Sequence, residues 1–249
     1  MTHIHLRQTT STSTLLRQML DEGKHFDSLS CITTDFQTGG RGQLGNSWES
    51  ADGQNLLISV FYAPQNLSVA SQFYISMAVC LALTDILSPM LANHSSALRI
   101  KWPNDIYVED KKIAGILIEN KLAGHSIAEC IIGLGLNVNQ QAFLSNAPNP
   151  ISLANLTSKT FDIEKIRQSF LSSLVTRLHL VDTEQFDTLV ADYRALLYRA
   201  DGQLHPFRTE GGRQFSAQIA NVAPDGRLTL TTADGQQLTF LFKEVEFVI

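Results

Sequence analysis

Charged residues are scarce in this sequence, and neither sign dominates. They make up 17% of the 249 residues, and 24 Asp and Glu against 19 Lys and Arg leave a formal net charge of −5. Binding to nucleic-acid phosphates depends on clustered Lys and Arg, and the sequence holds no basic run. The composition therefore argues against a nucleic-acid-binding protein, and we expect no DNA partner.

Uninterrupted apolar runs and paired cysteines are also lacking. The most apolar helical stretch, 73–91, is broken by polar residues and by Pro89, whereas a membrane span needs about 20 nearly uninterrupted apolar residues. The first residues contain no apolar core of a secretory signal. The cysteines lie far apart and fit no metal-binding spacing: Cys31, Cys80 and Cys130. Because 44% of the residues are hydrophobic, we expect a cytoplasmic globular protein with buried thiols and no membrane partner.

Hydrophobic patterns divide the chain into a long mixed part and a short β part. Helices are predicted from near Ser13 and over 73–91, 163–178 and 186–196, and strands over 29–34, 55–62, 98–102, 106–108, 112–119 and 127–138. After Asp201-Gly202 apolar residues alternate with period two, and Asp225-Gly226 and Asp234-Gly235 supply hairpin turns. We therefore expect an α+β fold with one domain over 1–200 and a small β-barrel over 201–249.

Three polar segments stand among apolar surroundings. Residues 39–48 (GGRGQLGNSW) hold closely spaced glycines, whose backbone N–H groups can surround an anion. Residues 101–105 (KWPND) form a rigid turn before Lys112, and 133–139 (GLGLNVN) place glycines inside a strand, where a ligand or another backbone comes close. Each segment alone also has an ordinary explanation: a surface loop, a solvated edge lysine, or a bulge.

In this order and spacing the segments resemble the biotin–protein ligases (biotin–[acetyl-CoA-carboxylase] ligases). Members carry Ser-Thr-Asn near the N-terminus, a Gly-Arg-Gly loop ending in Trp, Lys-Trp-Pro-Asn-Asp, Lys-x-x-Gly-Ile-Leu and Gly-x-Gly-x-Asn-x-Asn. The matching stretches here are 11–13, 40–48, 101–105, 112–117 and 133–139. The Lys-Trp-Pro-Asn-Asp run with Lys112 after it is the specific part, and the likeness extends from about residue 8 to residue 139.

The resemblance implies a fold and a two-step reaction. The fold is a catalytic domain similar to class II synthetases, with a mixed sheet and helices, followed by an SH3-like barrel. The reaction joins biotin and ATP into biotinyl-5′-AMP with release of pyrophosphate, and then transfers biotin to a lysine of the biotin carboxyl carrier domain of a carboxylase. Mg²⁺ would balance phosphate charge. The carrier would dock on an exposed strand, which could also serve a homodimer.

The resemblance also assigns site residues. Lys112 and Arg41 are the catalytic pair, because two anions meet in the first step and need cations between them. The biotin-binding residues would be Ser11, Thr12, Ser13, Gln37, Gly40, Arg41, Gly42, Gln43, Lys112, Gly115, Leu117, Gly133 and Gly135. Those that bind ATP or the adenylate would be Arg41, Trp48, Asn104, Asp105, Lys112 and Asn137. We expect no protein metal site, a Trp48 that covers the adenylate once the loop closes, and an Asn137 that contacts adenine.

Some positions depart from the family pattern. Ser13 stands where many members have Asn, and Gln43 and Asn46 stand where well-known bacterial members have Arg, so we expect the adenylate to be held loosely. Because the first helix is predicted to begin a dozen residues in, we expect the chain to lack the DNA-binding domain of bifunctional members. Two alternatives stay open: a lipoate or octanoate–protein ligase of similar fold, which lacks Lys-Trp-Pro-Asn-Asp, and a regulator that binds biotin without transferring it.

Overall fold

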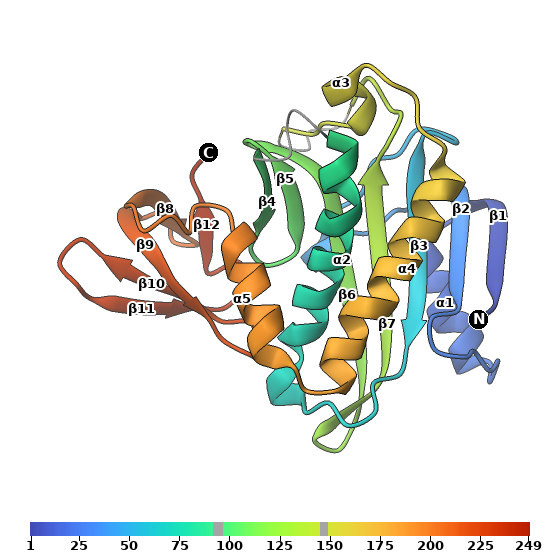
Figure 1. Cartoon of the computed structure of the whole chain (residues 1–249), viewed down its shortest axis with the longest axis horizontal. Coiled ribbons are helices and arrows are strands. Elements are labelled where there is room, and N and C mark those ends of the chain that lie inside the picture. Colours follow the sequence, from blue (N-terminus) through green and yellow to red (C-terminus); the bar gives the residue numbers. More distant parts are fainter. Residues whose placement is uncertain (92–96, 145–148) are drawn as a thin grey trace.

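The structure, a computed structural model, describes residues 1–91, 97–144 and 149–249. Seven strands form a mixed sheet in the order β1-β2-β3-β7-β6-β5-β4 (Figure 1). Only β1 and β2 run parallel, and the other neighbours are antiparallel. The strands span His3–Thr9 (β1), Cys31–Gln37 (β2), Asn55–Tyr62 (β3), Leu98–Lys101 (β4), Asp105–Val108 (β5), Lys111–Ala123 (β6) and Ser126–Asn137 (β7).

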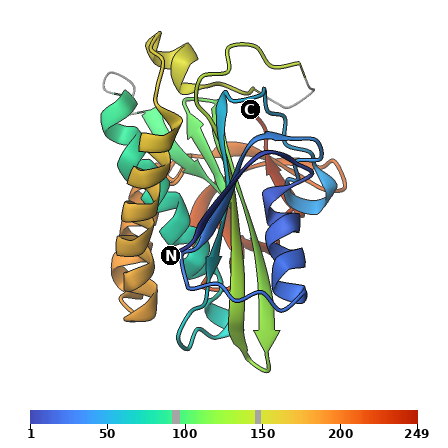
Figure 2. The ribbon, with the colours of Figure 1, turned by 90° about the vertical axis from the view of Figure 1, so that its right-hand side faces the viewer.

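Helices cover both faces of this sheet, to different extents. The long helices α2 (Phe73–Leu91) and α4 (Ile163–Asp182) pack on one face, and α5 (Phe186–Leu196) lies beside α2 and β4. The short α1 (Thr12–Asp21) packs on β2, β3 and β7 from the opposite face (Figure 2). A one-turn helix, α3 (Leu153–Thr157), follows β7. Because α1 is short, part of its face of the sheet is left for a binding site.

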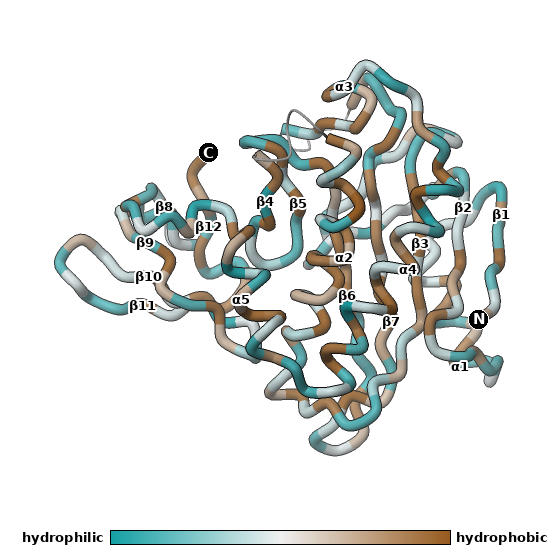
Figure 3. The backbone as a smooth tube through the Cα atoms, in the orientation of Figure 1, coloured by the Kyte–Doolittle hydropathy of each residue, from teal (hydrophilic) through white to brown (hydrophobic). Residues whose placement is uncertain are grey.

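Helix α2 forms the centre of the core. Within the described residues, the segment Val69–Leu91 is the one stretch whose length and composition would allow it to cross a membrane, with a mean hydropathy of 1.6. In this fold 67% of the most apolar 18-residue window of that segment is buried, and Figure 3 shows hydrophobic stretches along α2 and the central strands behind it. The sequence-based interpretation of 73–91 as a buried helix is therefore confirmed.

The C-terminal part forms a second sheet of five antiparallel strands in the order β11-β10-β9-β8-β12. These strands span His205–Thr209 (β8), Gln214–Val222 (β9), Leu228–Thr232 (β10), Gln237–Phe240 (β11) and Val245–Phe247 (β12). Gly226 and Gly235 have φ values of 95° and 85°, so the predicted hairpin turns are confirmed.

This second sheet is curled but open, whereas the resemblance implied a closed SH3-like barrel. Its edge strands β11 and β12 do not pair along a ladder. In a flat sheet the two edges would stand about 19 Å apart, but four residues, 241–244, connect them and reach roughly 17 Å. The sheet must therefore curl. Because β11 and β12 have only four and three residues, they offer few groups for closure.

The two sheets meet along a tight junction. The Trp102 indole N–H donates to the Gly226 carbonyl at 2.9 Å, and the Phe73 N–H donates to the Pro224 carbonyl at 2.9 Å. One cluster of buried apolar side chains runs from α2 and α5 into β8, β9 and β10. The C-terminal sheet is thus docked on the larger one, and a domain boundary at residue 200 stays a prediction.

Candidate active site

A cavity of about 540 Å³ opens on the face of the large sheet that α1 leaves uncovered. It is lined by the start of α1, the loop after β2, strands β5 to β7, and the C-terminal sheet. Most of the predicted site residues lie in its wall: Ser11, Thr12, Ser13, Gln37, Arg41, Gly42, Gln43, Trp48, Asn104, Asp105, Lys112, Gly115, Leu117 and Gly133. Residues distant in sequence thus meet in one place.

Uncharged hydrogen-bonding groups form one end of the cavity, where α1 begins. Ser11 caps α1 in an extended conformation, so its side chain stands at the helix entrance. The Oε1 atom of Gln37, at the end of β2, accepts from the Thr12 backbone N–H at 2.8 Å and from the Thr12 hydroxyl at 3.2 Å. The sequence predicted these three residues, and the structure brings them together.

A fully buried serine, absent from the sequence-based prediction, supports this end from behind the cavity wall. The Ser59 hydroxyl lies 2.7 Å from the Thr12 hydroxyl and 2.8 Å from the Ser13 hydroxyl. Gly133 pairs with Ser59 across β3 and β7, and a Cβ on Gly133 would approach the Ser13 hydroxyl to 2.6 Å. Ser59 is the one polar residue within the otherwise apolar stretch 56–61, which is the signal that could have revealed it.

A β-bulge turns Lys112 into the cavity. Ile113 has no partner on β5, because Tyr107 pairs with Lys112 while Ile106 pairs with Ala114. Ile113 and Ala114 therefore both face the buried core, where each is 0% exposed. Lys112 and Gly115 consequently share the cavity face although they are three residues apart. A Cβ on Gly115 would approach Lys112 Nζ to 3.2 Å, so the ammonium lies over that glycine.

Lys112 stands in the middle of the cavity in a defined setting. Its Nζ forms an ion pair with Asp105 Oδ1 at 2.6 Å and lies 5.8 Å from the centre of the Trp48 ring. The backbone of Ile116 holds Asn104 through two hydrogen bonds. The Ile116 N–H donates to the backbone carbonyl of Asn104 at 3.1 Å, and the side-chain amide of Asn104 donates to the Ile116 carbonyl. Asn104 thus fixes the turn that presents Asp105.

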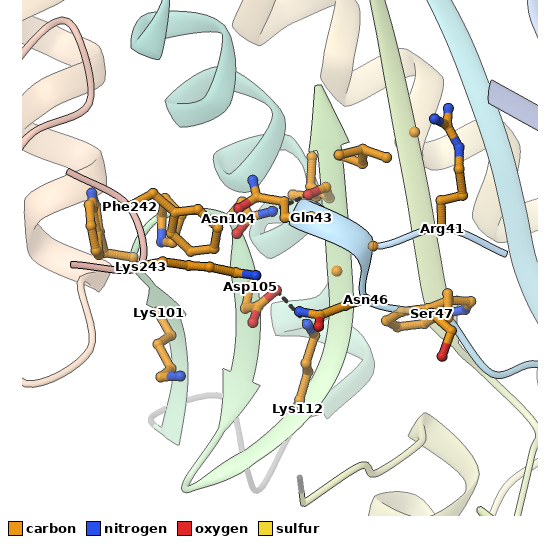
Figure 4. Close-up of a pocket in the computed structure, with 18 of the residues that line it drawn as sticks. Arg41, Gln43, Asn46, Ser47, Lys101, Asn104, Asp105, Lys112, Phe242 and Lys243 are labelled. Atoms are coloured by element: carbon orange, nitrogen blue, oxygen red, sulfur yellow. Dashed lines mark hydrogen bonds and ion pairs between the residues drawn. The ribbon is translucent and has the colours of Figure 1, made fainter. Parts of the chain in front are cut away.

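The glycine-rich loop folds into a small hairpin over the sheet. The Trp48 N–H donates to the Gly40 carbonyl at 2.9 Å, and Arg41 forms an isolated antiparallel bridge with Ser47. Arg41 donates to Glu119 on β6 at 2.8 Å, and Figure 4 shows its side chain directed away from Lys112. The predicted pair of Lys112 and Arg41 is therefore not assembled in this state, because the guanidinium binds the nearest carboxylate.

The Trp48 ring packs on two glycines, Gly115 and Gly135, which pair with each other across β6 and β7. A Cβ on Gly135 would come within 2.4 Å of the ring, and one on Gly115 within 3.0 Å. Position 135 therefore requires glycine as long as the ring is there, and at Gly115 a Cβ would fit only if the ring or Lys112 shifted slightly. Within the described chain no acceptor meets the buried Nε1 of Trp48, so the indole has an unused donor at this place.

Cationic residues gather at the other end, toward the C-terminal sheet. Lys101 lies next to Tyr107 and Phe247, with its Nζ 5.0 Å and 5.4 Å from the two ring centres. Burial lowers the pKa of Lys101, although the Asp105 carboxylate opposes that effect. The C-terminal wall contains Arg208, Thr209, Glu210, Phe242, Lys243, Val245, Glu246 and Phe247. The sequence analysis predicted none of these, since no pattern connects a hairpin near residue 245 with a turn near residue 103.

Three predicted residues do not line the cavity. Gly40 lies against the backbone of Trp48, and Gly135 lies beneath the Trp48 ring. Asn137 is 3% exposed and donates to the Ile151 carbonyl at 3.0 Å. The segment carrying Ile151 pairs in turn with the backbone of Lys112, whose N–H donates to the Asn149 carbonyl at 2.8 Å. The adenine contact of Asn137 stays a prediction, and in this state Asn137 helps to hold Lys112.

Across the sheet the cavity thus changes from neutral donors and acceptors, through a central lysine, to a charged end where Lys101, Arg208 and Lys243 outnumber Glu210 and Glu246. A ligand with an uncharged polar head and an anionic tail fits the first half, and a phosphate chain fits the second. Of the residues that the structure describes, no group of three or more His, Cys, Asp or Glu could hold a metal ion. The three cysteines are buried and free, and none lines the cavity.

Comparison with known sequences shows which proteins this chain resembles. Residues 5–137 match the biotin/lipoate A/B protein ligase family. The Mycobacterium tuberculosis biotin–[acetyl-CoA-carboxylase] ligase is 29% identical over 225 residues, which is 90% of this chain and 80% of that protein. The bifunctional ligase/repressor BirA of Escherichia coli is 34% identical over 128 residues, which is 51% of this chain and 38% of that protein. The chain thus matches well under half the length of the latter relative.

Solved structures share the architecture. The biotin protein ligase of Aquifex aeolicus, in complex with biotin and ATP, superimposes with a TM-score of 0.78 at 22% identity and covers 99% of both chains. The Leishmania major biotin protein ligase, in complex with biotinyl-5-AMP, gives a TM-score of 0.61 at 23% identity over 96% of this chain and 98% of that one. The second, smaller sheet is included in the near-complete coverage of both.

Proposed function

The chain belongs to the biotin/lipoate A/B protein ligase family, and from this premise we propose that it is an ATP-dependent biotin–protein ligase. It joins biotin to AMP and then transfers biotin to a lysine of a biotin carboxyl carrier domain. The observation that carries this choice is the neutral cluster of Ser11, Thr12, Ser13 and Gln37 at one end of the cavity, with Ser59 behind it. The ureido ring of biotin is uncharged and has two donors and one strong acceptor, which such a cluster can satisfy.

The cavity orients the substrates for the first step. With the ureido ring at the neutral end of the cavity, near the start of α1, the carboxylate of biotin reaches Lys112. ATP, with Mg²⁺ bound to its phosphates, occupies the end near the C-terminal sheet. A carboxylate oxygen attacks the α-phosphorus, and the bond from that phosphorus to the bridging oxygen breaks. The electron pair leaves with pyrophosphate. Lys112 offsets the repulsion between the two anions, and Arg41 joins it after releasing Glu119.

The second step needs little from the enzyme beyond access and exclusion of water. The neutral amine of the acceptor lysine attacks the acyl carbon, the bond to the phosphate oxygen breaks, AMP leaves with the electron pair, and the amine loses a proton to solvent. Trp48 and the loop around it cover the adenylate during this time. The carrier domain as acceptor, a possible homodimer and a cytoplasmic location belong to this proposal.

Mass spectrometry of the protein incubated with Mg-ATP and either biotin or lipoate tests the proposal. Biotinyl-AMP with pyrophosphate release, and no product from lipoate, is the expected result. Lipoyl-AMP in place of biotinyl-AMP would agree with the role of Lys112 but would contradict the assignment of the neutral cluster to the ureido ring of biotin. Adenylate from neither acid would contradict ligase activity altogether.

A further inference from the structure

The turn that leads into β12 carries a lysine in a backbone conformation that favours glycine. Lys243 has a φ of 72°, in the left-handed region that residues with a Cβ seldom adopt. Such conformations persist where the surroundings fix them, and they cluster at binding sites. The question is therefore which ligand a lysine held in this way would bind.

The side chain of Lys243 belongs to the cavity. It lines the wall together with Phe242 and Val245, on either side of the same turn. Figure 4 shows it extending from the C-terminal sheet toward the part of the cavity where Asp105 and Lys112 lie. The turn thus presents a flexible, strongly hydrated cation from a different sheet than the one that supplies Lys112.

The charge distribution of the cavity favours a phosphate chain near this lysine. Three lysines, Lys101, Lys112 and Lys243, line this part of the cavity, together with the carboxylates of Asp105, Glu210 and Glu246. The triphosphate of ATP carries several negative charges, and they grow on pyrophosphate as it leaves. Neutral adenine, in contrast, gains nothing from a cluster of lysines, so the phosphates rather than the base belong at this end.

We propose that Lys243 binds the β- and γ-phosphates of ATP and then the pyrophosphate that they become. This inference rests on the proposed function, which places biotin at the neutral end and Lys112 at the α-phosphate. Lys243 is thereby a binding residue of the first step only. It contacts neither the ureido ring nor the acceptor lysine, so the effects of changing it should be confined to ATP and pyrophosphate.

Three variants test the proposal. Lys243→Gly removes the charge and relaxes the backbone, and Lys243→Arg keeps the charge. Glu184→Gly is the matched control, because Glu184 is an exposed residue with a φ of 54° in the turn between α4 and α5 and does not line the cavity. Each protein, saturated with biotin, is titrated calorimetrically with Mg²⁺ and α,β-methylene-ATP, whose α–β linkage cannot break. Pyrophosphate-dependent ATP formation from biotinyl-AMP is measured alongside.

For Lys243→Gly we expect roughly 10- to 100-fold weaker binding of the analogue and a similar rise in the KM for pyrophosphate. Biotin affinity and the transfer of supplied biotinyl-AMP to hydroxylamine should stay within about two-fold. Both glycine variants should melt about 2 °C or more above the wild type, and Lys243→Arg should bind the analogue nearly as the wild type does.

Equal binding of the analogue by wild type and Lys243→Gly would overturn the proposal, as would loss of transfer from supplied biotinyl-AMP. Lack of binding to the wild type would overturn it as well. The titration breaks no bond, so its result is separate from the proposed function. A wild type that binds the analogue through Lys243 but forms no biotinyl-AMP would contradict the ligase reaction alone.

Discussion

At the scale of single residues, the site depends on a lysine that is already paired. Lys112 holds Asp105 at 2.6 Å and is 27% exposed, so its ammonium is oriented before any substrate arrives. Preorganised charge of this kind needs no reorientation during the reaction, which is why it contributes strongly to rate. Lys111, its neighbour, is exposed and absent from the cavity wall.

Replacing Lys112 with Ala should leave the fold intact and slow biotinyl-AMP formation about 10²- to 10³-fold, the usual effect of losing one preorganised group. The Lys111→Ala variant controls for loss of a positive charge on the same strand and should keep normal activity. Rates of adenylate formation, with circular dichroism to verify folding, measure both. Normal adenylate formation by Lys112→Ala would contradict its assigned role.

Lys101 makes stability depend on pH in a definite direction. Burial lowers its pKa in the folded protein, so between that value and its ordinary value near 10.5 the unfolded chain binds more protons than the folded one. Stability contributed by this residue must therefore rise with pH in that window. Urea unfolding between pH 7.5 and 10 gives the free energy of unfolding of the wild type and of Lys101→Met. The value for the wild type, relative to that of the variant, should increase as pH rises. A constant difference would contradict the shift.

At the scale of elements, the glycine-rich loop and the sheet are fitted to each other through one indole ring. Trp48 lies on Gly115 and Gly135, and the segment after it is tied down because Gln140 accepts from the Ala51 N–H at 2.9 Å. The loop is thus anchored at its end although its middle is glycine-rich. Movement of the Trp48 ring would expose the surface of Gly115 and Gly135 to a ligand without unfolding the hairpin.

Gly135→Ala should destabilise the protein by about 1–3 kcal/mol, because the new methyl group would overlap the Trp48 ring. In a Trp48→Ala background the same change should cost less than about 0.5 kcal/mol, since the clashing ring is gone. Free energies of unfolding for the four proteins of this double-mutant cycle give the coupling. Equal costs in both backgrounds would show that the ring does not lie on Gly135.

The sequence predicted the elements better than it predicted their contacts. The bounds of β3, α2 and α5 match the expected ranges, since long apolar periodicity determines them. Strand β1 was missed because its apolar residues, Ile4 and Leu6, alternate with His3, His5 and Arg7 over too short a run. Lys243 was missed for another reason: a residue 131 positions from Lys112 reaches the same cavity only through the docking of two sheets, which no local pattern encodes.

At the scale of the whole molecule, the two sheets share one apolar core and one cavity. The indole of Trp102, in the turn after β4, is 4% exposed and forms the hydrogen bond to Gly226 on the other side of the junction. Substrate contacts divided between two sheets require that their relative position be fixed. The continuous core supplies that rigidity.

Trp102→Phe should therefore lower the free energy of unfolding by about 1–3 kcal/mol, from the lost hydrogen bond and the smaller ring. The unfolding transition should remain single. Urea unfolding followed by tryptophan fluorescence and by far-ultraviolet circular dichroism should give coincident curves for wild type and variant. Two separated transitions in the wild type would show that the sheets unfold independently.

The bulge at Ile113 has a consequence for how this chain can change. On either side of it the odd and even positions of β6 exchange faces, so Lys112 is in the cavity because one unpaired residue precedes Ala114. A regular ladder that included Ile113 would turn Lys112 toward α2 with every side chain chemically unchanged, whereas deleting Ile113 would leave Lys112 opposite Tyr107 on the cavity face. An insertion in the Glu109-Asp110 turn, by contrast, leaves the face of Lys112 as it is. The hairpin can therefore vary in length at its tip, whereas the face that Lys112 occupies depends on Ile113 staying out of the ladder.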